Sequence, residues 1–303
     1  MNLPAGLTEP LKGHLAMLAF SALVAGSFSL GTMAAPHIDP GALTVVRFLV
    51  AGLIVGAVAL ATTGLPRSAA RAPWRYFVLG GLLASYFVLM FEGLKTAPAI
   101  SASAVFTLTP MMAAGFGWLV LRQVTTPRMA LALAIGAGGA IWVIFRADWA
   151  AVLRMEIGRG EVTYFWGCVA HALYAPMVRR LNRGEPAVVF TFGMMVAGFL
   201  LLCLWSGRAV LETDWGALPG IVWITLAYVA IAASAATFVL LQYATLRLPS
   251  AKVMAYTYLT PSWVILWEIA LGHGAPPALV VVGVMMTAAA LVLLLKDETP
   301  ARA

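Results

Sequence analysis

The sequence places a histidine and two tyrosines where they could bind a solute. His171 lies near the middle of a long apolar stretch, and helical spacing puts Tyr164, Gly167 and Tyr174 on the same face. A neutral imidazole and phenol hydroxyls can form hydrogen bonds in an apolar medium without the cost of a buried charge. This face therefore either borders a cavity or bonds the backbone of a neighbouring helix.

Other candidate solute-binding residues share faces in three further apolar stretches. They are Tyr86 with Met90, Ser103 with Phe106, and Tyr256 with Trp263. If these faces meet, they form a roomy, mostly apolar pocket that suits a flat hydrophobic amino acid. The alternative is that the aromatic residues lie in the belt at a membrane surface, which is our assignment for Trp267.

The elements that carry these residues are long apolar segments. The chain has 303 residues, of which 62% are hydrophobic and 10% charged, whereas a soluble domain has about 25% charged residues. Each segment has roughly the 20 residues that a helix needs to cross a bilayer. The sequence predicts an all-α integral membrane protein whose ten transmembrane helices cover residues 14–35, 40–64, 74–94, 98–121, 127–146, 162–181, 186–206, 218–243, 249–272 and 276–295.

The charged residues predict an orientation. If both termini are cytoplasmic, most Lys and Arg residues outside the spans lie in cytoplasmic loops, as is usual for membrane proteins. This distribution, rather than nucleic-acid binding, explains the net charge of +7. The loop 147–160 then lies outside, with a short segment along the interface. The two cysteines have no disulfide or metal-site spacing, so we expect neither a metal nor a cofactor.

An internal repeat divides the chain into two halves. Phe87-Val88-Leu89 recurs 151 residues later as Phe238-Val239-Leu240, and at the same separation Pro98 matches Pro249 and Pro110 matches Pro261. Five helices per half place the halves in opposite orientation, an arrangement found in many secondary transporters. We assign 1–148 to the first half, 149–160 to a periplasmic connection and 161–303 to the second half.

Pro110 and Pro261 lie near the middle of their spans, where each removes a backbone N–H and frees a carbonyl one turn earlier. We predict that they are hinges beside a central cavity, with static kinks that help packing as the alternative.

Arg47 is the charged residue most clearly inside a span. It could hold a solute carboxylate in a bidentate manner, although we favour a structural role in which it caps helix ends or pairs with Glu268. No Asp or Glu lies in mid-span, so the carboxylate relay of proton-coupled transporters is not visible. We expect solute flux down its own gradient, or weak coupling through His171.

The sequence offers little support for an enzyme or a channel. Ser27 and His171 could be imagined as a nucleophile and its base, but neither a G-x-S-x-G nor an H-E-x-x-H motif occurs. A channel would need a ring of charges or a carbonyl filter, and neither is evident. The partners that we expect are a small-molecule substrate and the lipid bilayer, with the chain acting as a monomer or homodimer.

An ordered set of motifs resembles the drug/metabolite transporter superfamily over nearly the whole chain. The motifs are Gly26-Ser27-Phe28, Arg47, Gly93-Leu94-Lys95-Thr96-Ala97, Leu108-Thr109-Pro110, Pro249 and Leu259-Thr260-Pro261. The chain is similar to the ten-helix EamA-type exporters, and most of all to bacterial aromatic amino-acid exporters of the YddG type. The resemblance implies an inner-membrane exporter of aromatic and other hydrophobic amino acids that works by alternating access, or else of a purine, amine or drug.

In one respect the sequence departs from that family. Members often carry a glutamate about 12 residues after each of the two mid-span prolines, where this chain has Arg122 and His273. Any role of that acid therefore does not carry over.

Overall fold

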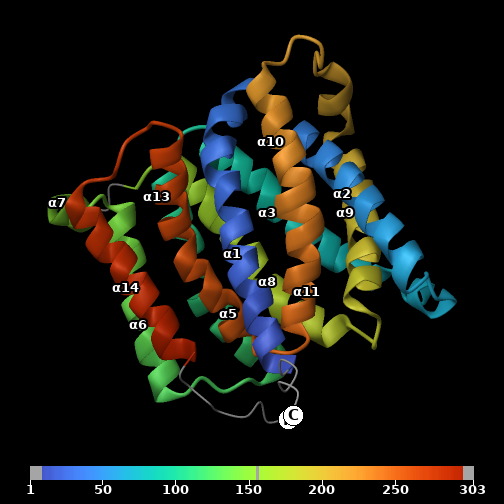
Figure 1. Ribbon diagram of the computed structural model, residues 1–303, viewed down its shortest axis with the longest axis horizontal. Helices are drawn as coiled ribbons and strands as arrows, with labels where there is room; N and C mark the ends of the chain where they lie inside the picture. The colour runs from blue at the N-terminus through green and yellow to red at the C-terminus, as the bar shows by residue number, and fades with distance from the viewer. Residues whose placement is uncertain (1–8, 155–156, 296–303) are drawn as a thin grey trace, which may run out of the picture.

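The computed structural model describes residues 9–154 and 157–295, and within them every regular element is helical. Figure 1 shows the helices as one bundle. The first half contains α1 (Glu9–Ala34), η1 (Ala35–His37), α2 (Pro40–Thr62), η2 (Arg67–Ala70), α3 (Trp74–Leu94), α4 (Ala99–Phe106), α5 (Thr109–Leu121) and α6 (Pro127–Ile144). The second half contains α8 (Arg159–Leu181), α9 (Ala187–Glu212), α10 (Gly220–Ala230), the π-helix η3 (Ile231–Ala236), α11 (Thr237–Thr245), α12 (Ser250–Ala255), the 3₁₀ segment η4 (Tyr256–Leu259), α13 (Thr260–Ala270) and α14 (Ala278–Leu295).

The predicted all-α membrane fold is confirmed. Within the described ranges, 8 helices are long and apolar enough to cross a membrane. The two remaining expected spans correspond to α8 and to the segment α12–η4–α13. Both segments are helical over the expected ranges, but their polar residues make them less apolar than the 8 membrane-spanning candidates. A count of ten spans therefore stays a prediction.

The helix starts follow from local capping chemistry. The Asp39 carboxylate accepts a hydrogen bond of 2.9 Å from Ala42 N, and Pro40 occupies the first helical position of α2. At the start of α6, Thr126 and Pro127 do the same, with the Thr126 hydroxyl 3.1 Å from Met129 N. The short segment α7 (Trp149–Arg154) lies at the connection between the halves, where the sequence predicts an interfacial segment.

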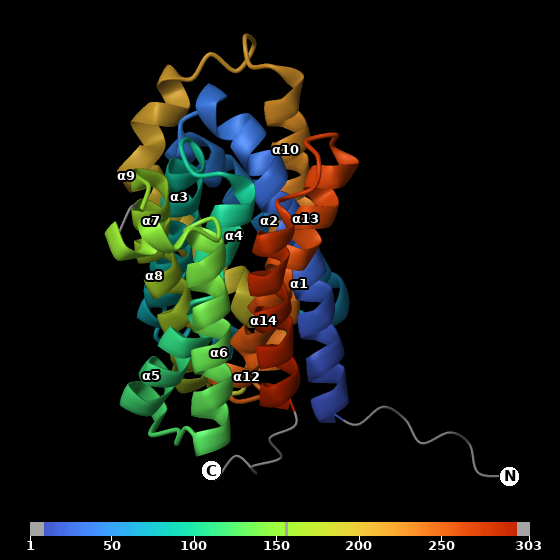
Figure 2. The same ribbon diagram turned by 90° about the vertical axis from the view of Figure 1, so that its left-hand side faces the viewer.

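The two halves pack in an antiparallel manner. Helix α4 contacts α13 while α5 contacts α12, so the two broken helices run in opposite directions along each other. In Figure 2, α4 and α13 lie towards one end of the bundle, and α5 and α12 towards the other. Equivalent helices also pair across the halves, as α2 with α9 and α6 with α14. These contacts are those of two repeats related by an approximate two-fold axis.

Both broken helices are interrupted just before the matched prolines. Thr107 and Leu108 separate α4 from α5, and the 3₁₀ segment η4 separates α12 from α13. Pro110 and Pro261 each lie in the first turn of the following helix, where the missing N–H costs no hydrogen bond. The Thr109 and Thr257 hydroxyls are 3.2 Å apart, so the two breaks meet near the centre of the bundle.

Candidate functional site

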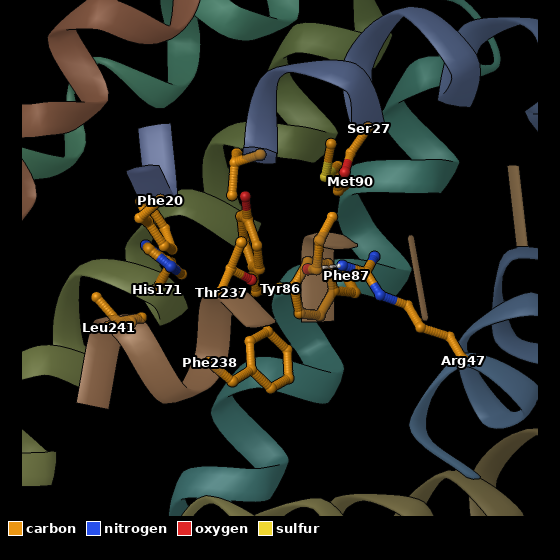
Figure 3. Close-up of a pocket in the computed structure, with 12 residues that line it drawn as sticks. Phe20, Ser27, Arg47, Tyr86, Phe87, Met90, His171, Thr237, Phe238 and Leu241 are labelled. Atoms are coloured by element: carbon orange, nitrogen blue, oxygen red, sulfur yellow. Dashed lines mark hydrogen bonds between the residues drawn. The ribbon is translucent and has the colours of Figure 1, made fainter. Parts of the chain in front are cut away.

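A small cavity lies near the centre of the bundle, between helices of both halves (Figure 3). Its volume is about 10 Å³, which is room for about one water molecule. The sequence predicts a roomy pocket, and in this conformation that expectation is wrong, because large aromatic side chains fill the space. The cavity is lined by Phe20, Val24, Ser27, Arg47, Tyr86, Phe87, Met90, His171, Ala233, Thr237, Phe238 and Leu241.

Most of the lining residues form pairs related by the repeat. Phe20 and His171, Tyr86 and Thr237, Phe87 and Phe238, and Met90 and Leu241 are each 151 residues apart. The rings of Phe87 and Phe238 stack with their centroids 5.5 Å apart. The cavity therefore lies on the approximate two-fold axis, and each half contributes the equivalent stretch of helix to its wall.

His171 lies in an aromatic cluster on one side of this cavity. Its ring centroid is 4.5 Å from that of Tyr86 and 5.2 Å from that of Phe106, and the side chain is 2% exposed. The Tyr86 hydroxyl lies 3.0 Å from the Tyr164 hydroxyl. The face of α8 that carries His171 therefore packs on α3.

Arg47 reaches the cavity from α2 and is fully buried. Its Nε donates to Ser234 Oγ at 2.5 Å and its Nη2 donates to the Ala233 carbonyl at 2.7 Å. The guanidinium carbon lies 3.6 Å from the centroid of the Phe87 ring, close enough for a cation–π interaction. The expected pair with Glu268 does not form, because Glu268 bonds His273 instead, at 2.9 Å.

Several polar atoms of the cavity wall have no hydrogen-bond partner among the described residues. They are Ser27 Oγ, Arg47 Nη1, His171 Nδ1 and Thr237 Oγ1. Buried polar groups are normally paired, so four unpaired groups at one small space mark a place where a polar ligand or water could bind. Ser27 and His171 are not bonded to each other through these atoms, so the arrangement of a nucleophile with its base is not present.

The structure brings some of the predicted binding residues together. His171, Tyr86 and Met90 line the cavity. Phe106 and Tyr174 lie directly behind them, both fully buried and both in ring contact with His171.

Three others lie elsewhere. The Ser103 hydroxyl donates to the Ile100 carbonyl of its own helix. The Tyr256 hydroxyl lies 3.1 Å from His14 Nδ1, and the Trp263 indole donates to Ser21 Oγ at 3.2 Å. Both aromatic residues therefore pack on α1 outside the cavity wall, and their contact with a solute stays a prediction.

Two polar residues of this region were not singled out from the sequence. Thr237 lines the cavity, and Gln242 accepts a hydrogen bond of 3.2 Å from the Tyr174 hydroxyl while its Nε2 has no partner within the described part of the chain. The repeat offered a signal for Thr237, because it is the counterpart of Tyr86. Nothing in the sequence marks Gln242 apart from its polarity within a span.

A buried ion pair lies at the far end of α3, away from the cavity. Arg75 Nη2 is 2.6 Å from Glu185 Oε1, and Arg75 also donates to the Leu181 carbonyl. Burial would raise the pKa of the Glu185 carboxyl, but the Arg75 guanidinium and the Arg183 backbone N–H hold that pKa below its ordinary value. The pair ties the loop between α8 and α9 to the start of α3.

Comparisons with known proteins agree with this architecture. The pattern of the EamA-like transporter family matches residues 11–145 and again residues 158–296. The chain is 22% identical over 225 residues to the "Uncharacterized transporter YyaM" of Bacillus subtilis (strain 168), which covers 73% of each protein. A solved structure titled "Crystal structure of protein" has a similar fold, with a TM-score of 0.69 and 23% identity over 96% of this chain and 99% of that one.

Proposed function

The chain belongs to the EamA-like transporter family, and from this premise we propose that it exports aromatic and other hydrophobic amino acids across a bacterial inner membrane. The observation that carries the proposal is the central cavity, which has aromatic walls from both halves and four unpaired polar atoms. An aromatic wall with a few polar groups suits a solute that has an apolar body and a polar head.

Transport by this chain would proceed by alternating access. A space of about 10 Å³ does not hold an amino acid, so the helices around it must separate before a solute enters. The breaks at Thr107–Leu108 and at Tyr256–Leu259 lie in contacting helices of opposite halves. Pro110 and Pro261 then act as hinges, because the turn before each proline lacks a full set of helical hydrogen bonds.

We place both termini in the cytoplasm. The start of α1 and the end of α14 lie at the same end of the bundle (Figure 2). The basic loop residues Arg67, Arg71 and Arg122 precede or follow helix ends on that side, in agreement with the excess of positive charge in cytoplasmic loops. Export, as opposed to import, is likewise proposed.

Counterflow in proteoliposomes tests the proposed function. Vesicles that contain the purified protein and unlabelled solute should accumulate labelled tryptophan and phenylalanine, should accumulate threonine weakly, and should leave adenine at the level of empty vesicles. His171→Ala should lower the flux of the aromatic solutes, while His37→Ala, at an exposed histidine, should not. Accumulation of adenine but of no amino acid would contradict the substrate class.

The same vesicles test the coupling. Because no Asp or Glu lines the cavity within the described chain, counterflow should persist when an ionophore removes the pH gradient. A flux that strictly requires an imposed pH or Na⁺ gradient would contradict uncoupled transport.

A further inference from the structure

Arg47 is a buried cation without an acidic partner in the described part of the chain. It lies about 10 Å along α2 from the helix start at Pro40, well within the apolar segment Pro40–Thr62. An unpaired charge at such a depth is costly, so charged groups inside membranes normally have a partner or a functional role. Among the described residues, its guanidinium donates to two neutral oxygens and lies over one aromatic ring.

The surroundings of Arg47 fix the plane of the guanidinium. Ser234 and Ala233 occupy the edge formed by Nε and Nη2, and the Phe87 ring covers one face. Both oxygens belong to the π-helix η3, and π-helical segments within longer helices are frequent at functional sites. A guanidinium has five N–H donors in a fixed fork. Three N–H groups are therefore left over, and two of them, one on Nη1 and the second on Nη2, are parallel to each other.

The unpaired end of the guanidinium is at the cavity. Arg47 Nη1 has no partner among the described residues, and the same is true of Ser27 Oγ and Thr237 Oγ1 in the same wall. Two parallel N–H groups match the two oxygens of a carboxylate, which gives a short, charge-assisted pair of hydrogen bonds. The hydroxyls of Ser27 and Thr237 could donate one bond each to the same anion.

We propose that Arg47 binds the carboxylate of the transported solute, end-on through Nη1 and Nη2, with the apolar body of the solute against the aromatic rings. The proposal rests on the proposed function and narrows it: the solute carries one carboxylate, and an amine without a carboxylate is rejected. Rejection follows because an amine brings no carboxylate to offset the charge of Arg47, so the guanidinium would repel its ammonium group, and the described wall holds no acid to receive that group instead.

Four probes that share a phenyl ring test this selectivity on the wild-type protein. They are phenylalanine, 3-phenylpropanoate, phenylalaninamide and phenethylamine, each used as a competitor of labelled phenylalanine in proteoliposome counterflow. Phenylalanine should compete at least about 10-fold better than the amide and the amine, since a charge-assisted pair of bonds corresponds to such a factor. Competition by 3-phenylpropanoate distinguishes a site for any carboxylate from one that also requires the amino group.

Equal competition by the amide or the amine would overturn the proposal while leaving transport itself intact. If labelled phenylalanine shows no counterflow at all, the proposed function fails, and the role of Arg47 that depends on it fails as well. The two failures are therefore distinguishable in one set of vesicles.

Substitution of Arg47 provides the second test. Arg47→Gln should lower the apparent affinity for phenylalanine by about 10- to 100-fold and should remove the preference for phenylalanine over its amide. Arg47→Lys keeps the charge but not the fork, so it should keep part of the preference. Arg208→Gln removes an exposed arginine of α9 and should change nothing. A folded Arg47→Gln protein that still prefers phenylalanine to the amide would overturn the proposal.

Discussion

Two contacts between the halves occupy equivalent places in the repeat and are built in opposite ways. Where α3 meets α9, Gly80 lies against Gly198 so closely that a Cβ on Gly80 would be 2.5 Å from the Gly198 backbone N. The repeat places the equivalent contact where α2 meets η3. There Ile231 corresponds to Gly80 and Arg47 corresponds to Gly198, each 151 residues away. Ile231 begins the π-helix, and the Arg47 guanidinium bonds its residues Ala233 and Ser234.

The difference indicates how one fold could supply both a scaffold and the proposed solute site. Glycines allow the backbones of two helices to come into direct contact, which strengthens helix packing in a membrane. At the equivalent place in the other pair, a large cation is inserted, the helix widens to a π-helix, and polar atoms remain unpaired. Transport chemistry is therefore expected on the side where the symmetry is broken, and rigidity on the side where backbones touch.

Filling the glycine contact should have the largest effect on folding. Gly80→Val would drive a side chain into the backbone of α9, which cannot move aside, and we expect a loss of about 3 kcal/mol of stability. Thermal unfolding in detergent and the yield of monodisperse protein measure the loss. Gly207→Val on α9 is the matched control, because nothing lies within 4 Å of a Cβ at Gly207. Equal stability of the two variants would mean that the α3–α9 contact is not tight.

The ion pair at the start of α3 is a second asymmetry, since Leu226 takes the place of Arg75 in the other half. Glu185→Gln should cost about 2 kcal/mol at neutral pH, because Arg75 loses its charged partner but keeps its carbonyl acceptors.

This cost should depend on pH. The folded-state pKa of Glu185 lies below the unfolded value, so its contribution to stability is complete at neutral pH and is lost as the pH falls below about 4. The melting temperatures of the wild type and Glu185→Gln should thus converge in acid. A constant difference across this range would contradict the charge-based account.

Removing one acceptor of Arg47 should have the smallest effect of the three. Ser234→Ala deletes the partner of Arg47 Nε, for which we expect about 1 kcal/mol of lost stability and a modest loss of affinity for solute. Ser29→Ala is the control, because the Ser29 hydroxyl is buried without a partner among the described residues and its removal should cost almost nothing. If Ser29→Ala proves more harmful, the π-helix does not orient Arg47.

Much of the fold could be predicted from the sequence, because the helices are determined by the composition and length of each segment. Span length and composition determine which segments are helices in a membrane, and the matched Pro98 and Pro249 together with Pro110 and Pro261 mark equivalent places in the two halves. The structure begins α4 after Pro98 and α12 after Pro249. The proline positions are readable from the sequence because proline restricts the backbone dihedral φ and lacks an N–H whatever its surroundings.

The cavity could be predicted only in part. Helical spacing shows that Tyr256 and Trp263 share a face with one another, but not which neighbour that face meets, and here it meets α1. The π-helix at Ile231–Ala236 has no sequence signature, so the polar surroundings of Arg47 could not be foreseen. The size of the cavity depends on side-chain packing among several helices, which no single segment encodes.

Alternating access requires a solute site on the approximate two-fold axis that opens to each side of the membrane in turn. A single cysteine at Ser27, introduced as Ser27→Cys in a Cys168→Ala, Cys203→Ala background, tests this directly with an impermeant thiol reagent added to either side. We predict labelling from both sides and protection by phenylalanine. Labelling from one side alone, or labelling that phenylalanine does not slow, would contradict the account.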